Sequence, residues 1–476
     1  MRSVSRLKCK PVSVIPAARA TRCHVSEFGR TVDENPLMLP GLPGGFGRCG
    51  GPELRFHRTL SLFAASLIAL APVSAMAQTQ TQTQAQTDAA ATAPQEVSRV
   101  QPVTVRDRPR PEYDAPGRRL GAFNLSASLD FDVTSTDNLF AAPDGFEFDD
   151  TIYEVTPTAR LESDWSRHML AVEASYTSRT HEDFSNEDAD THYLRGSGRL
   201  DIGDSSAINA AARVAHQVTP RTDPDSPLVG APVEYDRVDA TVGVQHRFAR
   251  FLLRLDGTRS EYDYEGAQDF RDNEENTLRG RVEVDMWPRV GLLLTATADD
   301  RSYDNSPNLS SEGFAYLVGA KIDADLVQGE VSIGHFQRDY DDPTVGTFEG
   351  LAISAAIDWL ASQLTTVTLS ARRNADDQIS ANVGQPYITT EFGARVDHEL
   401  RRNVILTGGV LFGERDYESI DRNDEYTEIS VGADWIVNPH AVVRFRYEHD
   451  ETDSSGALPY RDYEVNDVSL GLSLRL

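Results

Sequence analysis

From residue 123 onward, apolar residues occupy every second position in one segment after another. The last segment is the clearest case, with Val468, Leu470, Leu472, Leu474 and Leu476 alternating with polar or small residues. A period of two indicates a β-strand, because successive side chains leave a strand on opposite faces. Many strands with one apolar and one polar face, without a helical period between them, are typical of a transmembrane β-barrel.

Eighteen such segments are predicted, and the connections between them alternate between short and long. They are centred on 123–133, 151–164, 168–180, 190–202, 206–218, 235–248, 250–262, 276–287, 290–302, 312–325, 329–339, 348–359, 363–373, 387–399, 403–415, 427–437, 440–449 and 465–476. Short periplasmic turns, long outer loops and an even strand count are the arrangement of bacterial outer-membrane barrels. We therefore predict an all-β fold, a transmembrane antiparallel barrel of about 18 strands over residues 119–476. Sixteen strands is the alternative, because the first and eleventh segments are weakly patterned.

All four tryptophans fall where a predicted strand meets a short turn. They are Trp165, Trp287, Trp359 and Trp435. Indole prefers the membrane interface, where its ring meets lipid and its N–H meets water. We therefore expect a periplasmic aromatic girdle on the lipid-facing side.

The N-terminal part has the pattern of a secreted protein. Residues 54–77 combine a basic start, an apolar core from Leu60 to Val73 and a small-residue site ending at Ala77, which predicts a signal peptide cleaved after Ala77. Residues 1–53 form an upstream extension without a pattern, so translation could start near Leu54 instead. Residues 78–118 are of low complexity and then rich in proline and arginine, which predicts a disordered periplasmic linker. This linker would serve as a tether or as a tail that binds a partner.

Composition narrows the possible partners and chemistry. The mean hydropathy is −0.41, which suits a barrel because only half of each strand needs to be apolar. The whole chain has a net charge of −28, and residues 1–77 alone have a net charge of +6. Cleavage after Ala77 would therefore leave a mature chain with a net charge of about −34. Nucleic acid is excluded as a partner, because phosphate binding needs a basic surface. All cysteines (Cys9, Cys23 and Cys49) precede the cleavage site, which excludes thiol chemistry in the mature chain.

The polar face of the strands supplies the candidate site. It carries many charged residues, among them Arg213, Arg254, Arg281, Lys321, Arg395, Arg444, Arg446, Asp285, Asp323, Asp358 and Asp434. One interpretation is a ladder of cross-strand ion pairs that stiffens a wet wall, each pair contributing roughly 0.2–1 kcal/mol. The other is a polar conduit whose guanidinium groups bind sugar hydroxyls or carboxylates weakly and repeatedly. Both interpretations can hold together.

Catalysis and cofactor binding are not expected. The histidines after residue 77 are scattered, and motifs such as HExxH and GxSxG do not occur. The acidic loop clusters, such as Asp183 to Asp190 and Asp269 to Glu275, lack the spacing of a calcium loop. They are interpreted as a solvated surface, with divalent bridging to lipopolysaccharide as the alternative.

Two motifs resemble a known family. They are Thr136-Asp137-Asn138-Leu139-Phe140 and the segment from Pro157 to His168 that contains Ser163-Asp164-Trp165. The chain is similar here to the putative β-barrel porin 2 family, outer-membrane barrels like those encoded with exopolysaccharide synthesis and export systems. The chain departs from outer-membrane barrels in general by ending in Leu476 rather than in an aromatic residue.

The resemblance implies passage of a polysaccharide rather than catalysis. We expect an integral outer-membrane channel that passively exports an extracellular polysaccharide. A general diffusion porin is the first alternative, and an adhesin or receptor acting through the acidic loops is the second. The expected partners are outer-membrane lipid and lipopolysaccharide, the β-barrel assembly machinery and periplasmic polysaccharide export components.

Overall fold

The computed structural model describes residues 103–476 with the exception of 225, 228–229, 381–382 and 458–460. The predicted upstream extension, the signal peptide with its cleavage after Ala77, and linker residues 78–102 lie outside the described residues. Among the described residues, no helix is long and apolar enough to cross a bilayer.

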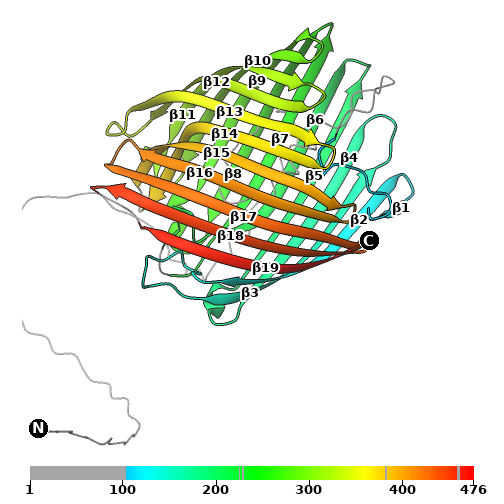
Figure 1. Cartoon of the computed structure of the whole chain (residues 1–476). Coiled ribbons are helices and arrows are strands. Elements are labelled where there is room, and N and C mark those ends of the chain that lie inside the picture. The colour runs from blue at the N-terminus through cyan, green and yellow to red at the C-terminus, as the bar shows by residue number, and fades with distance from the viewer. Residues whose placement is uncertain (1–102, 225, 228–229, 381–382, 458–460) are drawn as a thin grey trace, which may run out of the picture. The chain divides into compact units, whose positions relative to one another are not determined.

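Eighteen long antiparallel strands, β2 to β19, close into one barrel (Figure 1). Each strand pairs with its neighbours in sequence, and β19 pairs with β2 from Asp467–Thr136 to Arg475–Ser128, which closes the ring. The remaining strand, β1 (Arg118–Leu120), pairs only with the start of β2. The predicted 18-stranded barrel is therefore confirmed, and the 16-stranded alternative is wrong.

The barrel strands are 13 to 19 residues long. They are β2 (Phe123–Thr136), β3 (Asp150–Ser163), β4 (Met169–His181), β5 (Ala189–Ile202), β6 (Ser206–Thr219), β7 (Val233–Phe248), β8 (Phe251–Tyr264), β9 (Asn273–Trp287), β10 (Val290–Tyr303), β11 (Ser311–Asp323), β12 (Val327–Tyr340), β13 (Thr347–Ser362), β14 (Thr365–Ser380), β15 (Val383–Arg401), β16 (Val404–Tyr417), β17 (Arg422–Asn438), β18 (Ala441–Gly456) and β19 (Tyr463–Arg475). A barrel of 16 to 18 strands is wide enough to enclose an aqueous channel.

The outer face of the barrel is apolar and exposed. In β11, for example, the side chains of Phe314, Tyr316 and Val318 are 47–51% exposed although they lie in the middle of the barrel wall. Large apolar side chains in a continuous band are costly in water and stable in lipid. The four tryptophans are also 44–65% exposed, and all lie at the end of the barrel that carries the short turns.

The two ends of the barrel differ in the length of their connections. Hairpin turns at one end, such as Ala249–Arg250 and Pro288–Arg289, are short, and we call this the periplasmic end. Connections at the other, extracellular end are mostly longer and contain three short 3₁₀ helices. These are η1 (Ser185–Glu187), η2 (Gly266–Arg271) and η3 (Pro307–Leu309).

Several late strands extend further than predicted at the extracellular end. The segment predicted at 440–449 continues as β18 to Gly456, and the loop expected from Tyr417 to Tyr426 shrinks to residues 418–421. Backbone pairing between strands does not require lipid, so an acidic hairpin remains paired where both of its faces are wet. Loss of apolar alternation therefore indicated the end of the lipid-facing part and not the end of the strand.

Candidate functional site: the lumen and its two ends

The inward face is identified by ion pairs that skip strands. Arg281 on β9 makes two hydrogen bonds with Glu330 on β12, at 2.9 and 2.5 Å, although β10 and β11 lie between them. Arg301 on β10 likewise reaches Asp377 on β14 at 2.5 Å. Such contacts are short only across the concave inside of a closed sheet. The alternating polar face of the strands therefore lines a lumen.

The predicted lumen residues share this face with the strand-skipping pairs, and most of them have partners. Lys321 pairs with Glu283 at 2.9 Å, and Arg444 pairs with Asp130 and Asp132 at 3.0 Å. The other contacts are Arg395–Asp397 at 3.0 Å, Arg446–Asp434 at 2.5 Å, Asp285–Arg247 at 2.9 Å and the hydrogen bond from Thr368 to Asp358 at 2.6 Å. Asp323 is exposed at the periplasmic end of β11. Ion pairing along the wall thus accounts for a large part of the predicted set.

Among the lumen arginines of strands β5 to β9, four have no carboxylate within 4.0 Å in the described part of the chain. We call them the arginine band: Arg195 on β5, Arg213 on β6, Arg254 on β8 and Arg279 on β9. Two arginine pairs stand directly opposite each other in the strand register, Arg195 with Arg213 and Arg254 with Arg281. Like charges placed opposite each other on a sheet are destabilising. A purely structural role does not explain this arrangement.

The carboxylates that face the band in the strand register bind other side chains. Glu173 faces Arg195 in the register, but it accepts hydrogen bonds from Arg160 at 3.1 Å and from the Tyr193 hydroxyl at 2.6 Å. Asp239 faces Arg213 in the same way, and it accepts from Arg237 at 2.9 Å and from Ser260 at 2.6 Å.

A glycine explains why Arg279 of the band has no carboxylate partner among the described residues. Asp256 faces Arg279 in the register, but its carboxylate lies over Gly243 on the other side of β8. A Cβ atom at Gly243 would come within 2.3 Å of the Asp256 oxygen, so only glycine leaves room for this placement. The guanidinium group of Arg279 remains exposed to the water of the lumen.

The wall formed by β17 to β19 has the opposite charge pattern. Glu428 stands opposite Asp450, and Glu448 stands opposite Asp467. None of these four carboxylates has a basic partner within 4.0 Å among the described residues. Three strands lie between this wall and the arginine band on one side of the ring, and seven lie between them on the other. The lumen thus has a cationic wall (green in Figure 1) facing an anionic one (orange and red).

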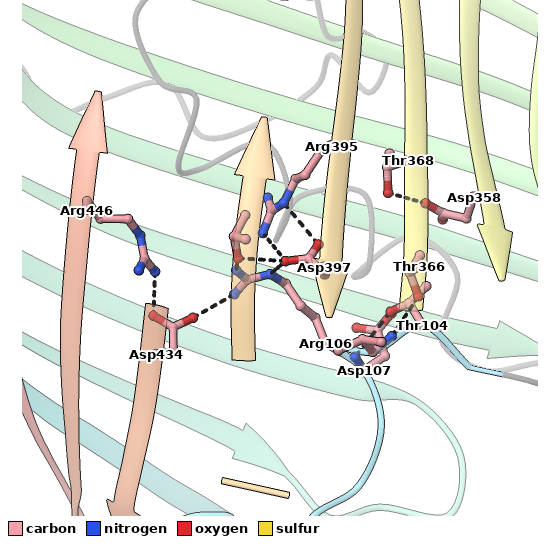
Figure 2. Close-up of polar contacts among 12 residues, drawn as sticks. Thr104, Arg106, Asp107, Asp358, Thr366, Thr368, Arg395, Asp397, Asp434 and Arg446 are labelled. Carbon is pink, nitrogen blue, oxygen red and sulfur yellow. Dashed lines mark hydrogen bonds and ion pairs between the residues drawn. The ribbon is translucent and has the colours of Figure 1, made fainter. Parts of the chain in front are cut away.

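The periplasmic end of the lumen holds residues 103–117, which we call the strap. The Arg106 guanidinium donates to Asp397 at 2.7 Å, to Asp434 at 3.3 Å and to Thr407 at 2.6 Å, as Figure 2 shows for the two aspartates. The backbone N–H of Val105, a residue that is 1% exposed, donates to the Thr366 hydroxyl at 2.9 Å. The strap is therefore anchored inside the barrel.

Two further strap arginines share a single carboxylate. Arg108 and Arg110 each lie 3.1 Å from the same oxygen of Glu399, whose side chain is only 2% exposed. Arg110 also donates to the carbonyl oxygens of Val105 and Arg108, which closes the strap on itself. Further along the strap, the Tyr113 carbonyl accepts a hydrogen bond from Arg475 on β19 at 3.5 Å.

The prediction of a disordered linker up to residue 118 is therefore wrong for residues 103–117. Sequence composition indicated a chain that cannot bury apolar surface and so stays disordered. The strap is held by charge instead, because the barrel presents carboxylates at the place where its arginines arrive. Nothing in the composition of the strap itself identifies those carboxylates.

At the extracellular end, loops fold inward over the lumen. Arg221, in the loop between β6 and β7, pairs with Glu187 of η1 at 2.7 Å, and both side chains are at least 91% buried. The Tyr463 hydroxyl of β19 donates to the Thr222 carbonyl at 3.1 Å. Ala141, in the loop between β2 and β3, packs against Tyr463 and Val465. These contacts connect loops from distant strands across part of the mouth.

The acidic loop clusters are held mainly by hydrogen bonds. Asp272, between η2 and β9, accepts from the Tyr264 N–H at 2.8 Å and from Asn305 at 3.3 Å. Burial raises the pKa of the Asp272 carboxyl, the Tyr264 N–H opposes this rise, and the neighbouring Asp269 and Asp304 charges add to it. Within the described residues, no group of three or more His, Cys, Asp or Glu side chains is placed to hold a metal ion.

A comparison with known protein families identifies the family of this barrel. The family model described as Putative beta-barrel porin 2 matches residues 110–476, which is the whole barrel together with the end of the strap. The chain belongs to the putative β-barrel porin 2 family. The resemblance expected from the two short motifs is thereby confirmed, and the chain is an outer-membrane β-barrel of a porin family. No curated protein matches it.

Solved structures of outer-membrane barrels resemble this family member in fold. The outer membrane protein OpdK of Pseudomonas aeruginosa is 9% identical, with 74% of this chain and 99% of that chain covered and a TM-score of 0.45. OpdQ of the same organism is 12% identical, with 77% and 100% covered and a TM-score of 0.42. The siderophore receptor PirA of P. aeruginosa is 10% identical, with 74% and 80% covered and a TM-score of 0.39.

Some residues of the site were not predicted from the sequence. Arg195 shares a face with Tyr193 and alternates with Leu194, so the period of two could have placed it in the lumen. The strap arginines Arg106, Arg108 and Arg110 carried no such signal, because their partners lie about 290 to 330 residues away in the chain.

Proposed function

We propose that this barrel is a passive conduit for the export of an extracellular polysaccharide across the outer membrane. The arginine band is the observation that carries the proposal. Its guanidinium groups face a wet lumen and have no carboxylate partner among the described residues, so they can bind hydroxyl or carboxylate groups of a passing chain. Family membership supports a channel, and the polysaccharide cargo is the part we propose.

Conduction along a polymer needs several weak sites rather than one tight site. The band supplies them on β5, β6, β8 and β9, with Arg254 ten residues from the extracellular end of its strand and the other three at one common depth. Arg195, Arg213 and Arg279 each lie six residues from the extracellular end of their strand. A chain that leaves one guanidinium group therefore meets the next on the same wall. Because such groups bind carboxylates in pairs of hydrogen bonds, a polymer bearing carboxylates would gain most.

A gene deletion tests this proposal directly. We expect cells without the protein to retain polymer, so that secreted polysaccharide falls while the cell-bound amount does not. Complementation with wild type should restore export, and complementation with Arg195→Gln/Arg213→Gln should restore it only in part. Unchanged polymer export in the deletion strain would contradict the proposal.

A general diffusion porin is the second candidate, and the inward-folded extracellular loops favour it. The contacts of Arg221 and Tyr463 restrict part of the mouth, as expected of a channel for small solutes. The same deletion strain discriminates the two, because a porin predicts normal polymer export with slower uptake of small solutes. The inward folding counts against an adhesin, which needs projecting loops.

A further inference from the structure

The periplasmic carboxylates form a site that is distinct from the arginine band. Asp397, Glu399 and Asp434 lie on the lumen face near the periplasmic ends of β15 and β17, and together they accept three arginines of the strap. The strap reaches these carboxylates as a folded segment, with turns at residues 105–107 and 111–113 and with Arg110 bonded back to the Val105 carbonyl. We propose that this site is a receptor for a turn-forming, arginine-bearing peptide, that the strap is its resident ligand, and that release of the strap widens the periplasmic mouth.

The way the strap is held makes it displaceable. Residues 103–117 contribute no strand to the barrel sheet, and the first ladder pairing is that of Arg118 with Leu125. The polar contacts that anchor the strap to β14–β17 come from three arginine side chains and the N–H of Val105, whose side chain is also buried. Ring closure between β19 and β2 uses none of these groups. The strap can therefore leave without opening the barrel.

The site also stays organised when the strap is absent. Asp397 keeps Arg395 at 3.0 Å and the Thr407 hydroxyl at 2.9 Å. Asp434 keeps Arg446 at 2.5 Å. Glu399 then faces the water that enters the mouth. A receptor with two of its three carboxylates held in place by the barrel can lose its ligand and bind it again.

The path of the strap explains why its release matters for the channel. It begins beside β14 at Val105, reaches β17 through Arg106 and meets β19 at Tyr113 before joining β1. It thus follows seven of the eighteen strands, β14 to β19 and β2, at the periplasmic end. This placement narrows the entrance from the periplasm whatever the cargo is.

A reversible cross-link tests the proposal in the full-length channel. The sequence after Ala77 contains no cysteine, so Val105→Cys/Thr366→Cys introduces the only thiol pair in that part of the chain. We expect the oxidised channel in a planar bilayer to show a low, steady conductance. Reduction should raise the mean conductance by about twofold, because current follows the narrowest cross-section of a pore. Failure of the pair to cross-link, or equal conductance before and after reduction, would overturn the proposal.

Charge substitutions give an independent measurement. Arg106→Gln/Arg108→Gln/Arg110→Gln should conduct more than wild type and more than the reduced cysteine variant, because both of these keep the three arginine anchors. The control is Arg119→Gln, which removes a cation from a neighbouring pair with Asp164 that is 68% and 46% exposed and lies outside the site. We expect the control to conduct like wild type. Equal conductance of the triple variant and wild type would show that the strap does not restrict the mouth.

Discussion

Single residues on the two faces of each strand meet opposite requirements. Val318 and Trp359 lie on the outer face and are 47% and 48% exposed, so their side chains must suit lipid. Arg281, on the inner face, must suit water and a carboxylate, and it pairs with Glu330. A period of two in the sequence encodes this division, because adjacent residues cannot share a face.

Substitutions on the two faces should therefore differ in cost. We expect Val318→Arg to destabilise the folded barrel by about 2–4 kcal/mol, because it places a charge near the middle of the bilayer. Trp359→Arg should cost less, about 1 kcal/mol, since interfacial positions tolerate charge better. Arg281→Ala should have the smallest effect, because it changes only the wetted face. Unfolding by urea in lipid vesicles measures all three, and an Arg281→Ala cost above that of Val318→Arg would mean that the faces are reversed.

At the scale of elements, the connections have roles that the strands do not. The loop between β6 and β7 is fixed chiefly by Arg221, which binds Glu187 through two hydrogen bonds and the carbonyl oxygens of Pro227 and Gly230 at 2.8 Å. Its guanidinium group also stacks over Phe140 at 5.5 Å. One side chain thus connects the loop to two others.

Loss of that side chain should release the loop while the barrel remains intact. We expect Arg221→Ala to leave the thermal unfolding of the barrel almost unchanged and to speed protease cleavage within residues 220–232 by about tenfold or more, because Glu187 would lose its buried partner. Mean single-channel conductance should also rise. Arg259→Ala is the control, since the pair of Arg259 with Glu274 is solvent-exposed. Cleavage at the same rate in both variants would show that Arg221 does not hold the loop.

At the scale of the whole molecule, charge is separated across the lumen. The arginine band on β5 to β9 faces the carboxylates on β17 to β19, although the chain as a whole carries a net charge of −28. Such a separation sets up a field across the path of a solute rather than along it. The permeability ratio of the channel therefore depends on both walls together.

Removal of part of the cationic wall should shift ion selectivity toward cations. We expect Arg195→Gln/Arg213→Gln to lower the anion-to-cation permeability ratio by about twofold in dilute salt, and the shift should shrink near 1 M because ions screen the wall. Reversal potentials under a salt gradient measure the ratio. Arg119→Gln/Arg289→Gln removes the same net charge from exposed positions on β1 and in the turn after β9, and it should leave the ratio unchanged. An equal shift in both double variants would mean that the wall has no special role.

How much of this molecule could be predicted varies from one part to another. The alternation ending in Leu476 and the spacing of short turns were enough to predict the closed 18-stranded barrel. Strand ends were predicted less well, as in β18, because pairing continues above the lipid where the apolar pattern stops. The lumen residues could be identified by face, but their partners could not, because Arg281 and Glu330 lie 49 positions apart on strands that do not touch.

The sequence by itself determined the strand pattern, the apolar outer face and the polar inner face, because these depend on neighbouring residues along one strand. Tertiary structure decided which charges are paired. Contacts within β7 and between adjacent strands occupy Glu173 and Asp239, and the placement of Asp256 over Gly243 leaves Arg279 without a carboxylate partner among the described residues, so that a band of arginines remains. It also decided that residues 103–117 lie inside the barrel, because the carboxylates that bind their arginines come from strands near the other end of the chain.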